Sequence, residues 1–198
     1  MTTPPPSTEA DRVPHIVGRR TLHKGRKFDF EILTVRQGRT ETQREVVRHP
    51  GAVVVVPLLD DGRIVLIRNH RVALGEGERL WECCAGTIEP PEEPILCAAR
   101  ELIEETGYRA ATLAPLGWFY TTPGLTNERM HAFVATSLTD VGQNLEDDES
   151  IEVEPVPASR VLDMIASGEL RDAKSMLAIL LAQRAGHLPN GTAPTPTR

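Results

Sequence analysis

The segment from residue 86 to 108, GTIEPPEEPILCAARELIEETGY, constrains this chain more than any other part of it. It places three carboxylates, Glu101, Glu104 and Glu105, at positions i, i+3 and i+4, which an α-helix gathers on one face. Three like charges packed together are costly unless a cation neutralises them. Hard divalent ions such as Mg²⁺ take oxygen ligands of this kind, and substrate phosphates often complete their shell. The pattern therefore predicts a helix that carries a metal site for phosphate chemistry.

Four further residues stand at fixed distances around these glutamates, namely Gly86, Glu92, Arg100 and Gly107. An amphipathic surface helix with a solvated acidic face is the alternative interpretation, and it leaves the glycines and Arg100 unexplained. With these residues included, the segment resembles the Nudix box at every fixed position up to the apolar Tyr108. The resemblance implies the Nudix fold, an α/β/α sandwich in which a mixed sheet lies between helices.

The resemblance also implies a metal site. Its ligands would be the carboxylates of Glu101, Glu104 and Glu105 and the backbone carbonyl of Ala85, and its ion would be Mg²⁺, with Mn²⁺ able to replace it. A diphosphate link resists hydrolysis because its negative oxygens repel a nucleophile, and a bound metal neutralises them and activates water. Arg100 would assist catalysis by orienting the glutamates through ion pairs. The remaining motif residues would have supporting or structural roles: Glu92, Gly86 and Gly107.

Residues outside this segment indicate the substrate class. In GWFYTTPGLTNE, Pro123 lies fifteen residues beyond Tyr108, and Glu128 follows five residues later. This spacing resembles that of the ADP-ribose pyrophosphatase subfamily, which implies that both residues contact the substrate. Arg71 matches an arginine that meets the substrate phosphate in that subfamily. The alternatives are an ordinary type II turn at Pro123-Gly124 and a solvated strand end at Arg71.

The acidic segment EDDES is the expected source of the catalytic base. The subfamily places a catalytic glutamate in the corresponding loop, and Glu149 is favoured there over Glu146, Asp147 and Asp148. If none of these four is needed, Glu104 is the expected base. A solvated acidic loop without a catalytic role is the alternative.

Two further candidates concern the nucleobase. In the subfamily an N-terminal aromatic residue and an arginine sandwich adenine, one of them supplied by the partner subunit, and Phe28 and Arg44 match these positions. Stacking of a ring and a cation on a base is physically sound. Phe28 also lies in an alternating strand pattern, so a core position is its alternative. The six histidines show no ligand spacing, and we interpret them as structural or surface residues.

Composition excludes several classes of function. The net charge of −6 argues against nucleic acid as a partner. No apolar run approaches the ~20 residues that a membrane span needs. The start of the chain has neither the positive nor the apolar region of a signal peptide. The chain has three cysteines, an odd number, and two of them are adjacent, so they do not form a disulfide framework. This favours a location in the reducing cytoplasm.

The chain of 198 residues is expected to form one α+β domain between two Pro- and Thr-rich tails. The tails are residues 1–13 and 188–198, and the domain spans residues 14–187. It would include an N-terminal antiparallel β segment at about residues 16–50. Periodicity predicts strands at residues 28–35, 43–49, 52–58, 63–68, 82–85, 112–119, 131–137 and 151–156.

Three helices are predicted, of which the first carries the acidic motif. Pro94 can occupy its first turn, and Gly107 supplies its left-handed end. Its buried stripe is expected to consist of apolar residues: Ile95, Ala98, Ala99, Leu102 and Ile103. The other helices are expected at residues 158–167 and, after Asp172 as N-cap, up to residue 185. After a turn at residues 60–62, the run 63–68 is expected to pair with 52–58 as a hairpin.

We therefore expect a Mg²⁺-dependent Nudix hydrolase that converts ADP-ribose to AMP and ribose 5-phosphate. The resemblance implies a homodimer in which the N-terminal β segment completes the adenine pocket of its partner. One alternative is a hydrolase of another nucleoside diphosphate sugar, such as GDP-mannose. Another is a non-catalytic ADP-ribose-binding regulator of transcription. It would need an appended winged-helix domain, for which we expect no room after the final helix, and the net charge of −6 counts against DNA binding.

Overall fold

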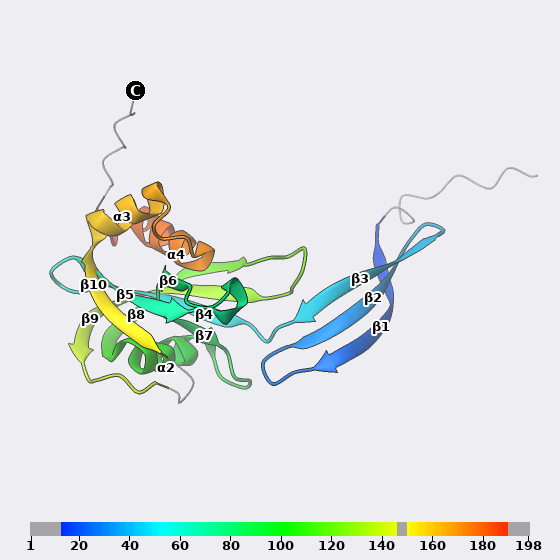
Figure 1. Ribbon diagram of the computed structural model, residues 1–198, viewed down its shortest axis with the longest axis horizontal. Coiled ribbons are helices and arrows are strands. Elements are labelled where there is room, and N and C mark those ends of the chain that lie inside the picture. The colour runs from blue at the N-terminus through cyan, green and yellow to red at the C-terminus, as the bar shows by residue number, and fades with distance from the viewer. Residues whose placement is uncertain (1–12, 146–149, 190–198) are drawn as a thin grey trace, which may run out of the picture. The chain divides into compact units, whose positions relative to one another are not determined.

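The computed structural model describes residues 13–145 and 150–189, which form two compact units (Figure 1). The first unit comprises the described residues up to Pro50 together with Thr122–Glu128. The second comprises Gly51–Thr121 and the described residues from Arg129 onward. The candidate bases between 146 and 149 and both predicted tails, apart from residues 13, 188 and 189, lie outside the described residues.

The first unit is an antiparallel sheet of three strands in the order β1-β2-β3. The strands are β1 (His15–Lys24), β2 (Asp29–Gln37) and β3 (Thr40–Arg48). The predictions of strands at 28–35 and 43–49 are therefore confirmed. Strand β1 was not predicted as a separate element, because nearly all its side chains are exposed and no apolar alternation marks it.

The described residues of the second unit form two sheets. One is mixed, in the order β7-β4-β9-β8, with β4 and β9 parallel and the other pairs antiparallel. The other is antiparallel, in the order β10-β5-β6. The bounds of the strands are β4 (Ala52–Pro57), β5 (Arg63–His70), β6 (Arg79–Glu82), β7 (Ala85–Thr87), β8 (Tyr108–Tyr120), β9 (Arg129–Asp140) and β10 (Ile151–Pro157), and a 3₁₀ turn, η1, covers Val72–Leu74.

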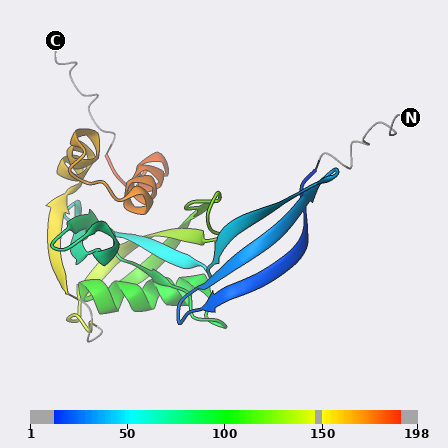
Figure 2. The ribbon, with the colours of Figure 1, turned by 45° about the vertical axis from the view of Figure 1, so that its right-hand side comes forward.

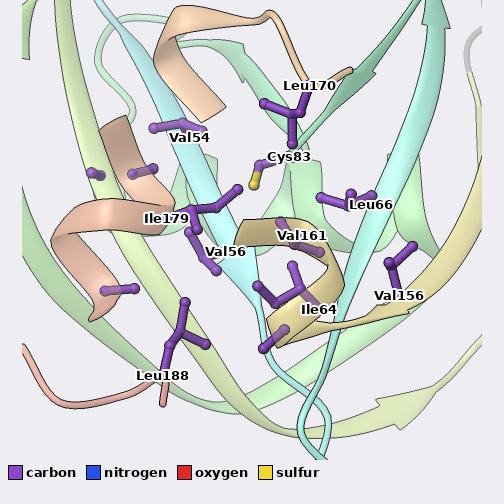
Figure 3. Packing of buried hydrophobic residues seen from close by; sticks show 14 of the residues in the cluster. Val54, Val56, Ile64, Leu66, Cys83, Val156, Val161, Leu170, Ile179 and Leu188 are labelled. Carbon is purple, nitrogen blue, oxygen red and sulfur yellow. The ribbon is translucent and has the colours of Figure 1, made fainter. Parts of the chain in front are cut away.

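In the part of the chain that the structure describes, three α-helices cover these sheets: α2 (Pro94–Thr106), α3 (Ala158–Ser167) and α4 (Ala173–Arg184). Figure 2 shows α2 on one side of the strands and α3 and α4 on the other. The central strand β4 is apolar on both faces because each face meets a helical layer. Val53 and Val55 pack in the cluster that contains Leu102 of α2. Val54 and Val56 pack with the α3 and α4 residues of the other cluster (Figure 3). The predicted α+β class and α/β/α layering are confirmed.

The predicted hairpin between residues 52–58 and 63–68 is wrong. The turn exists, since the N–H of Gly62 donates to the carbonyl of Leu59 at 2.9 Å. After it, however, the two strands enter different sheets, and only an isolated bridge between Leu58 and Ile64 joins them. Strand β5 pairs instead with β6 and β10. Because both runs are continuously apolar, the sequence does not distinguish a hairpin from two separately buried strands.

The strand predicted at residues 82–85 is divided between the two sheets. Glu82 ends β6, which pairs with β5, and Ala85 begins β7, which pairs with β4. The residues between them cross from one sheet to the other. Their backbone is fixed on the way, because Val55 N–H donates to the Cys84 carbonyl at 2.9 Å.

The predicted apolar stripe of the first helix is also partly wrong. Ile95 is 46% exposed, and Ala99 and Ile103 are only half-buried. The helix is rotated so that two carboxylates lie in its buried face, which consists of Cys97, Ala98, Glu101, Leu102, Glu105 and Thr106. Among the described residues, no helix is both long and apolar enough to cross a membrane.

Candidate active site

Helix α2 has the start and the end that its sequence predicts. Pro94 occupies the first turn after the extended residue Glu93, and the helix stops at Gly107, whose φ is 76°. The Gly107 N–H donates to the Ile103 carbonyl at 2.9 Å. A Cβ at this glycine would lie 2.8 Å from the Gln143 nitrogen, so both the left-handed backbone and the close packing require glycine.

Two carboxylates of α2 are buried against strand β7. Glu105 is 3% exposed, and its Oε2 accepts the Ala85 N–H at 2.8 Å. Glu101 is 9% exposed, and its carboxylate lies directly against Gly86. A Cβ added to Gly86 would be 1.8 Å from Glu101 Oε1, so this carboxylate occupies the space that any side chain at position 86 would fill.

Arg100 joins three carboxylates of this segment, those of Glu92, Glu101 and Glu104, into one cluster. Its Nη1 donates to Glu101 Oε1 at 2.8 Å and to Glu104 Oε2 at 2.9 Å. Its Nε and Nη2 both donate to Glu92, each at 3.1 Å. The pKa of Arg100 is raised, chiefly by its hydrogen bond to Glu92, and the same bond lowers the pKa of Glu92. The predicted ion pairs of Arg100 with the glutamates are therefore present.

The donor set of this cluster fits a hard divalent cation. It consists of carboxylate oxygens, two of the side chains are buried, and the missing side chain of Gly86 makes room for the Glu101 carboxylate. In the part of the chain that the structure describes, no three His, Cys, Asp or Glu side chains converge in ligating positions. The oxygens are held instead by Arg100 and by the Ala85 N–H.

Arg71 belongs to a second charged cluster in the same unit. Its Nε donates to Glu82 Oε1 at 2.7 Å and its Nη2 to Glu82 Oε2 at 2.5 Å. Glu82 is fully buried and also accepts Lys174 Nζ at 2.5 Å. Burial raises the pKa of Glu82, but the bonds from Arg71 and the charge of Lys174 outweigh it, so the pKa lies below its usual value. Arg71 is therefore not a simple solvated strand end.

In the first unit, Phe28, His49 and Glu128 lie together. The rings of Phe28 and His49 stack with centroids 6.4 Å apart and planes at 26°. His49 Nε2 lies 3.8 Å from Glu128 Oε1. Burial lowers the pKa of His49, the Glu128 charge opposes this, and Lys27 adds to it. Phe28 is 51% exposed, so its alternative assignment to the core is wrong.

The contacts of His49 with Phe28 and Glu128 were not predicted. The prediction treated every histidine as structural or surface because none showed ligand spacing, and no local signal distinguishes this one. It follows the last residue of β3 and is held by the loop that carries Glu128. Its N–H donates to Asn127 Oδ1 at 2.9 Å, and Asn127 Nδ2 donates to its carbonyl at 3.1 Å.

Arg44 lies apart from Phe28 within one chain. It is exposed on β3 and pairs with Leu33 of β2. Leu33 is five residues along the chain from Phe28, roughly 16 Å at the usual strand rise. A sandwich of one base by both side chains therefore cannot form from one copy in this conformation.

The predicted turn at Pro123 is confirmed, but its type is not. Leu125 N–H and Thr126 N–H both donate to the Thr122 carbonyl at 2.9 Å. Gly124 is not among the residues with positive φ, which a type II turn requires at that position.

The chain just before residue 146 is tied to the end of α2. Gln143 Nε2 donates to the Glu105 carbonyl at 2.7 Å, and the Asn144 N–H donates to the Glu104 carbonyl at 3.2 Å. These donors satisfy carbonyls that a helix end leaves without an intrahelical partner. The acidic segment, with Glu149, continues outside the described residues.

Comparison with known proteins gives four matches that bear on this site. The model of the NUDIX domain matches residues 47–179. An ADP-ribose pyrophosphatase of Bacillus subtilis (strain 168) is 41% identical over 145 residues, which are 72% of this chain and 77% of the relative. A GDP-mannose pyrophosphatase of Escherichia coli is 34% identical over 166 residues, covering 76% of this chain and 86% of the relative. Among solved structures, an ADP compounds hydrolase superposes with a TM-score of 0.73 at 24% identity, covering 87% of this chain and 93% of that one, which shows the shared fold.

Proposed function

Because this chain belongs to the Nudix family and is a pyrophosphohydrolase of that family, we propose that it hydrolyses ADP-ribose to AMP and ribose 5-phosphate. The observation that carries the proposal is the cluster on α2, in which Arg100 holds Glu101 and Glu104 while the Ala85 N–H holds Glu105. The choice of ADP-ribose rests on the identity of 41% with the Bacillus subtilis ADP-ribose pyrophosphatase.

The carboxylates of α2 are proposed to hold Mg²⁺, or Mn²⁺ in its place. The residues that would bind it are Glu101, Glu104, Glu105 and the carbonyl of Ala85. A divalent ion bound there supplies neutralisation of the diphosphate oxygens and an activated water. Arg100 keeps Glu101 and Glu104 at a fixed separation, because one Nη1 bonds both. Glu92 holds the other side of the same guanidinium.

The proton of the attacking water is proposed to pass to a carboxylate. Glu149 is the first candidate, with Glu146, Asp147 and Asp148 as its rivals and Glu104 as the candidate from the helix. Gln143 and Asn144, which precede this segment in the chain, are both bonded to the end of α2. A general base must reach its proton at hydrogen-bond distance, so this anchorage is relevant to the assignment.

Substrate contacts are proposed for five residues: Arg71, Glu128, Pro123, Phe28 and Arg44. The exposed ring of Phe28 supports a stacking role, and Arg71 has the charge to receive a phosphate. Because Phe28 and Arg44 lie apart within one chain, a sandwich needs a second copy, which supports a homodimer. A cytoplasmic location is proposed from the free cysteines Cys83, Cys84 and Cys97.

GDP-mannose is the second candidate substrate, because the Escherichia coli relative that is 34% identical is a GDP-mannose pyrophosphatase. The test is incubation with a panel of nucleoside diphosphate sugars and Mg²⁺, followed by identification of products by chromatography. We expect ADP-ribose to give the highest kcat/KM and to yield AMP and ribose 5-phosphate. A higher kcat/KM for GDP-mannose would replace the proposed substrate, and no turnover of any panel member would refute the proposed function.

A further inference from the structure

Glu82 forms a buried charge cluster with two cationic partners, Arg71 and Lys174, which is unusual for an ion pair that only stabilises a fold. Glu82 is buried and accepts three hydrogen bonds, two from Arg71 and one from Lys174. Taking charges out of water is costly, and well-packed apolar residues of similar volume often stabilise a protein as much or more. Stability alone therefore explains this cluster poorly, and a requirement for fixed geometry explains it better.

The exposed end of the cluster is Arg71. Its side chain is 40% exposed, whereas that of Glu82 is 1% exposed. A guanidinium has five N–H donors, and two of them bond Glu82, so three are directed elsewhere. The pKa of Arg71 is raised, chiefly by its bond to Glu82, with smaller contributions from the charges of Glu105 and Asp172. The field of Glu105 on this guanidinium links Arg71 to the carboxylates of α2.

We propose that Glu82 is a positioning residue that, together with Lys174, holds the Arg71 guanidinium in the orientation that receives the substrate diphosphate. This inference rests on the proposed function, because it takes a nucleoside diphosphate sugar as the substrate. Two parallel bonds fix the plane of a guanidinium, which a single bond does not. Glu82 and Lys174 act through Arg71 and do not touch the substrate.

The N-terminus of α4 is therefore a support of the active site. Lys174 Nζ bonds Glu82 and also lies 2.9 Å from Asp172 Oδ2, the N-cap carboxylate of the helix. Ser175 Oγ donates to the same Asp172 oxygen and accepts the Cys83 N–H at 2.8 Å. The helix thus fixes both the side chain of Glu82 and the backbone of the residue after it.

The same segment is fixed at its other end by α2, since the Ala85 N–H donates to Glu105 Oε2 at 2.8 Å. Residues 82–85 therefore connect the two charged clusters of the second unit. A displacement of Glu82 is expected to reach Arg71 through the two bonds and the Ala85 carbonyl through the backbone. A displaced Arg71 guanidinium is expected to weaken substrate binding, and the test below measures this loss of affinity.

The test compares Glu82→Gln with wild type in steady-state hydrolysis of ADP-ribose and in calorimetric binding of α,β-methylene ADP-ribose, which is not hydrolysed. Gln keeps the shape but removes the charge that orients Arg71. We expect KM and the analogue Kd to rise about tenfold while kcat changes no more than about threefold, the pattern of lost ground-state binding. The matched control is Glu152→Gln, which removes the exposed Arg79–Glu152 ion pair of the same sheet and should change neither constant.

A double-mutant cycle with Arg71→Ala distinguishes positioning from a structural role. If Glu82 acts through Arg71, Glu82→Gln should change kcat/KM less than about twofold in the Arg71→Ala background. Additive losses would overturn the proposal. A wild type that turns over no nucleoside diphosphate sugar would instead refute the proposed function, so the two failures are distinguishable.

Lys174 provides a second route that does not depend on the folding of Glu82→Gln. Lys174→Arg keeps a cation beside Glu82 and should retain the wild-type KM. Lys174→Met removes the cation, and we expect KM to rise about threefold or more as Glu82 loses one of its partners. Equal KM values for the two variants would overturn the role of Lys174, and unchanged values in both Lys174→Met and Glu82→Gln would overturn the whole proposal.

Discussion

The contact between Gly86 and Glu101 predicts a variant that loses activity without losing its fold. In Gly86→Ala the new Cβ would lie 1.8 Å from Glu101 Oε1 and 1.9 Å from its Cδ, whereas real Cβ contacts essentially never fall below 3.0 Å. The carboxylate must therefore move by at least about 1.2 Å, which is the difference between the 3.0 Å limit and the 1.8 Å contact with Oε1. Such a movement disturbs its 2.8 Å bond to Arg100 and its place among the proposed metal ligands.

The effect on activity should be large and the effect on stability small. A misplacement of about 1 Å at a catalytic group costs roughly 10²-fold in rate, so kcat/KM should fall about 10²-fold. The backbone of Gly86 does not have a positive φ, so alanine is not strained there. The clashing atoms are the far end of a side chain that can rotate away. Replacing Gly by Ala also restricts the unfolded chain by about 0.4–1 kcal/mol, which offsets part of the cost.

The assay is release of phosphate from the products of ADP-ribose hydrolysis by an added phosphatase, together with thermal unfolding followed by circular dichroism. Gly18→Ala is the matched control, because its Cβ would meet only the Thr34 side chain, at 3.3 Å, and its φ is not positive. A folded Gly86→Ala variant with near-normal kcat/KM would refute the close packing of Glu101 against this glycine. An unfolded variant with a normal Gly18→Ala control would show that the backbone, and not the carboxylate, is the constrained part.

Four further predictions concern the helix, its end, the acidic segment and the assembly. Glu105→Gln should lower kcat by at least ~10²-fold at saturating Mg²⁺ while the fold is kept, and near-native turnover would remove Glu105 from the metal site. Gly107→Ala should lower the free energy of unfolding, measured in urea, by about 2 kcal/mol or more, because its left-handed φ and the 2.8 Å contact to the Gln143 nitrogen both oppose a Cβ. Its control is Gly142→Ala, where φ is 84° and the space is open, so only the cost of the left-handed backbone should appear. Glu149→Gln should lower kcat without weakening binding of α,β-methylene ADP-ribose, and normal rates in variants of all four acidic residues would move the base to Glu104. Light scattering should give a dimer mass, and deletion of residues 1–50 should abolish activity and lower solubility; a concentration-independent monomer mass would contradict the proposed dimer.

Features that depend on a few neighbouring residues can be predicted from the amino-acid sequence alone. Pro94 and Gly107 define the ends of α2 because one fits the first helical turn and the other adopts a left-handed backbone. Asp172 predicted the start of α4 because its side chain accepts the Ser175 N–H. The spacing of the carboxylates on α2, with Arg100 among them, is fixed by the helical repeat in the same way.

Features that depend on partners far along the chain become visible only in the folded structure. Strands β4 and β5 are apolar on both faces, so periodicity could not show that they belong to different sheets. The ring of Phe28 was expected in an alternating pattern, but it is exposed and meets His49 only because the two flank paired strands.

The charged groups of α2 and Glu82 show the same contrast between what local sequence predicts and what the fold decides. Helical spacing put the glutamates of α2 on one face, but only packing against Gly86 and Ala85 decided that this face is buried while Ile95 is exposed. Nothing near Glu82 in the sequence indicates that Lys174, on the last helix, will pair with it. Local conformational preferences are encoded within a helical turn or a strand, whereas the neutralisation of a buried charge depends on which elements the fold brings together.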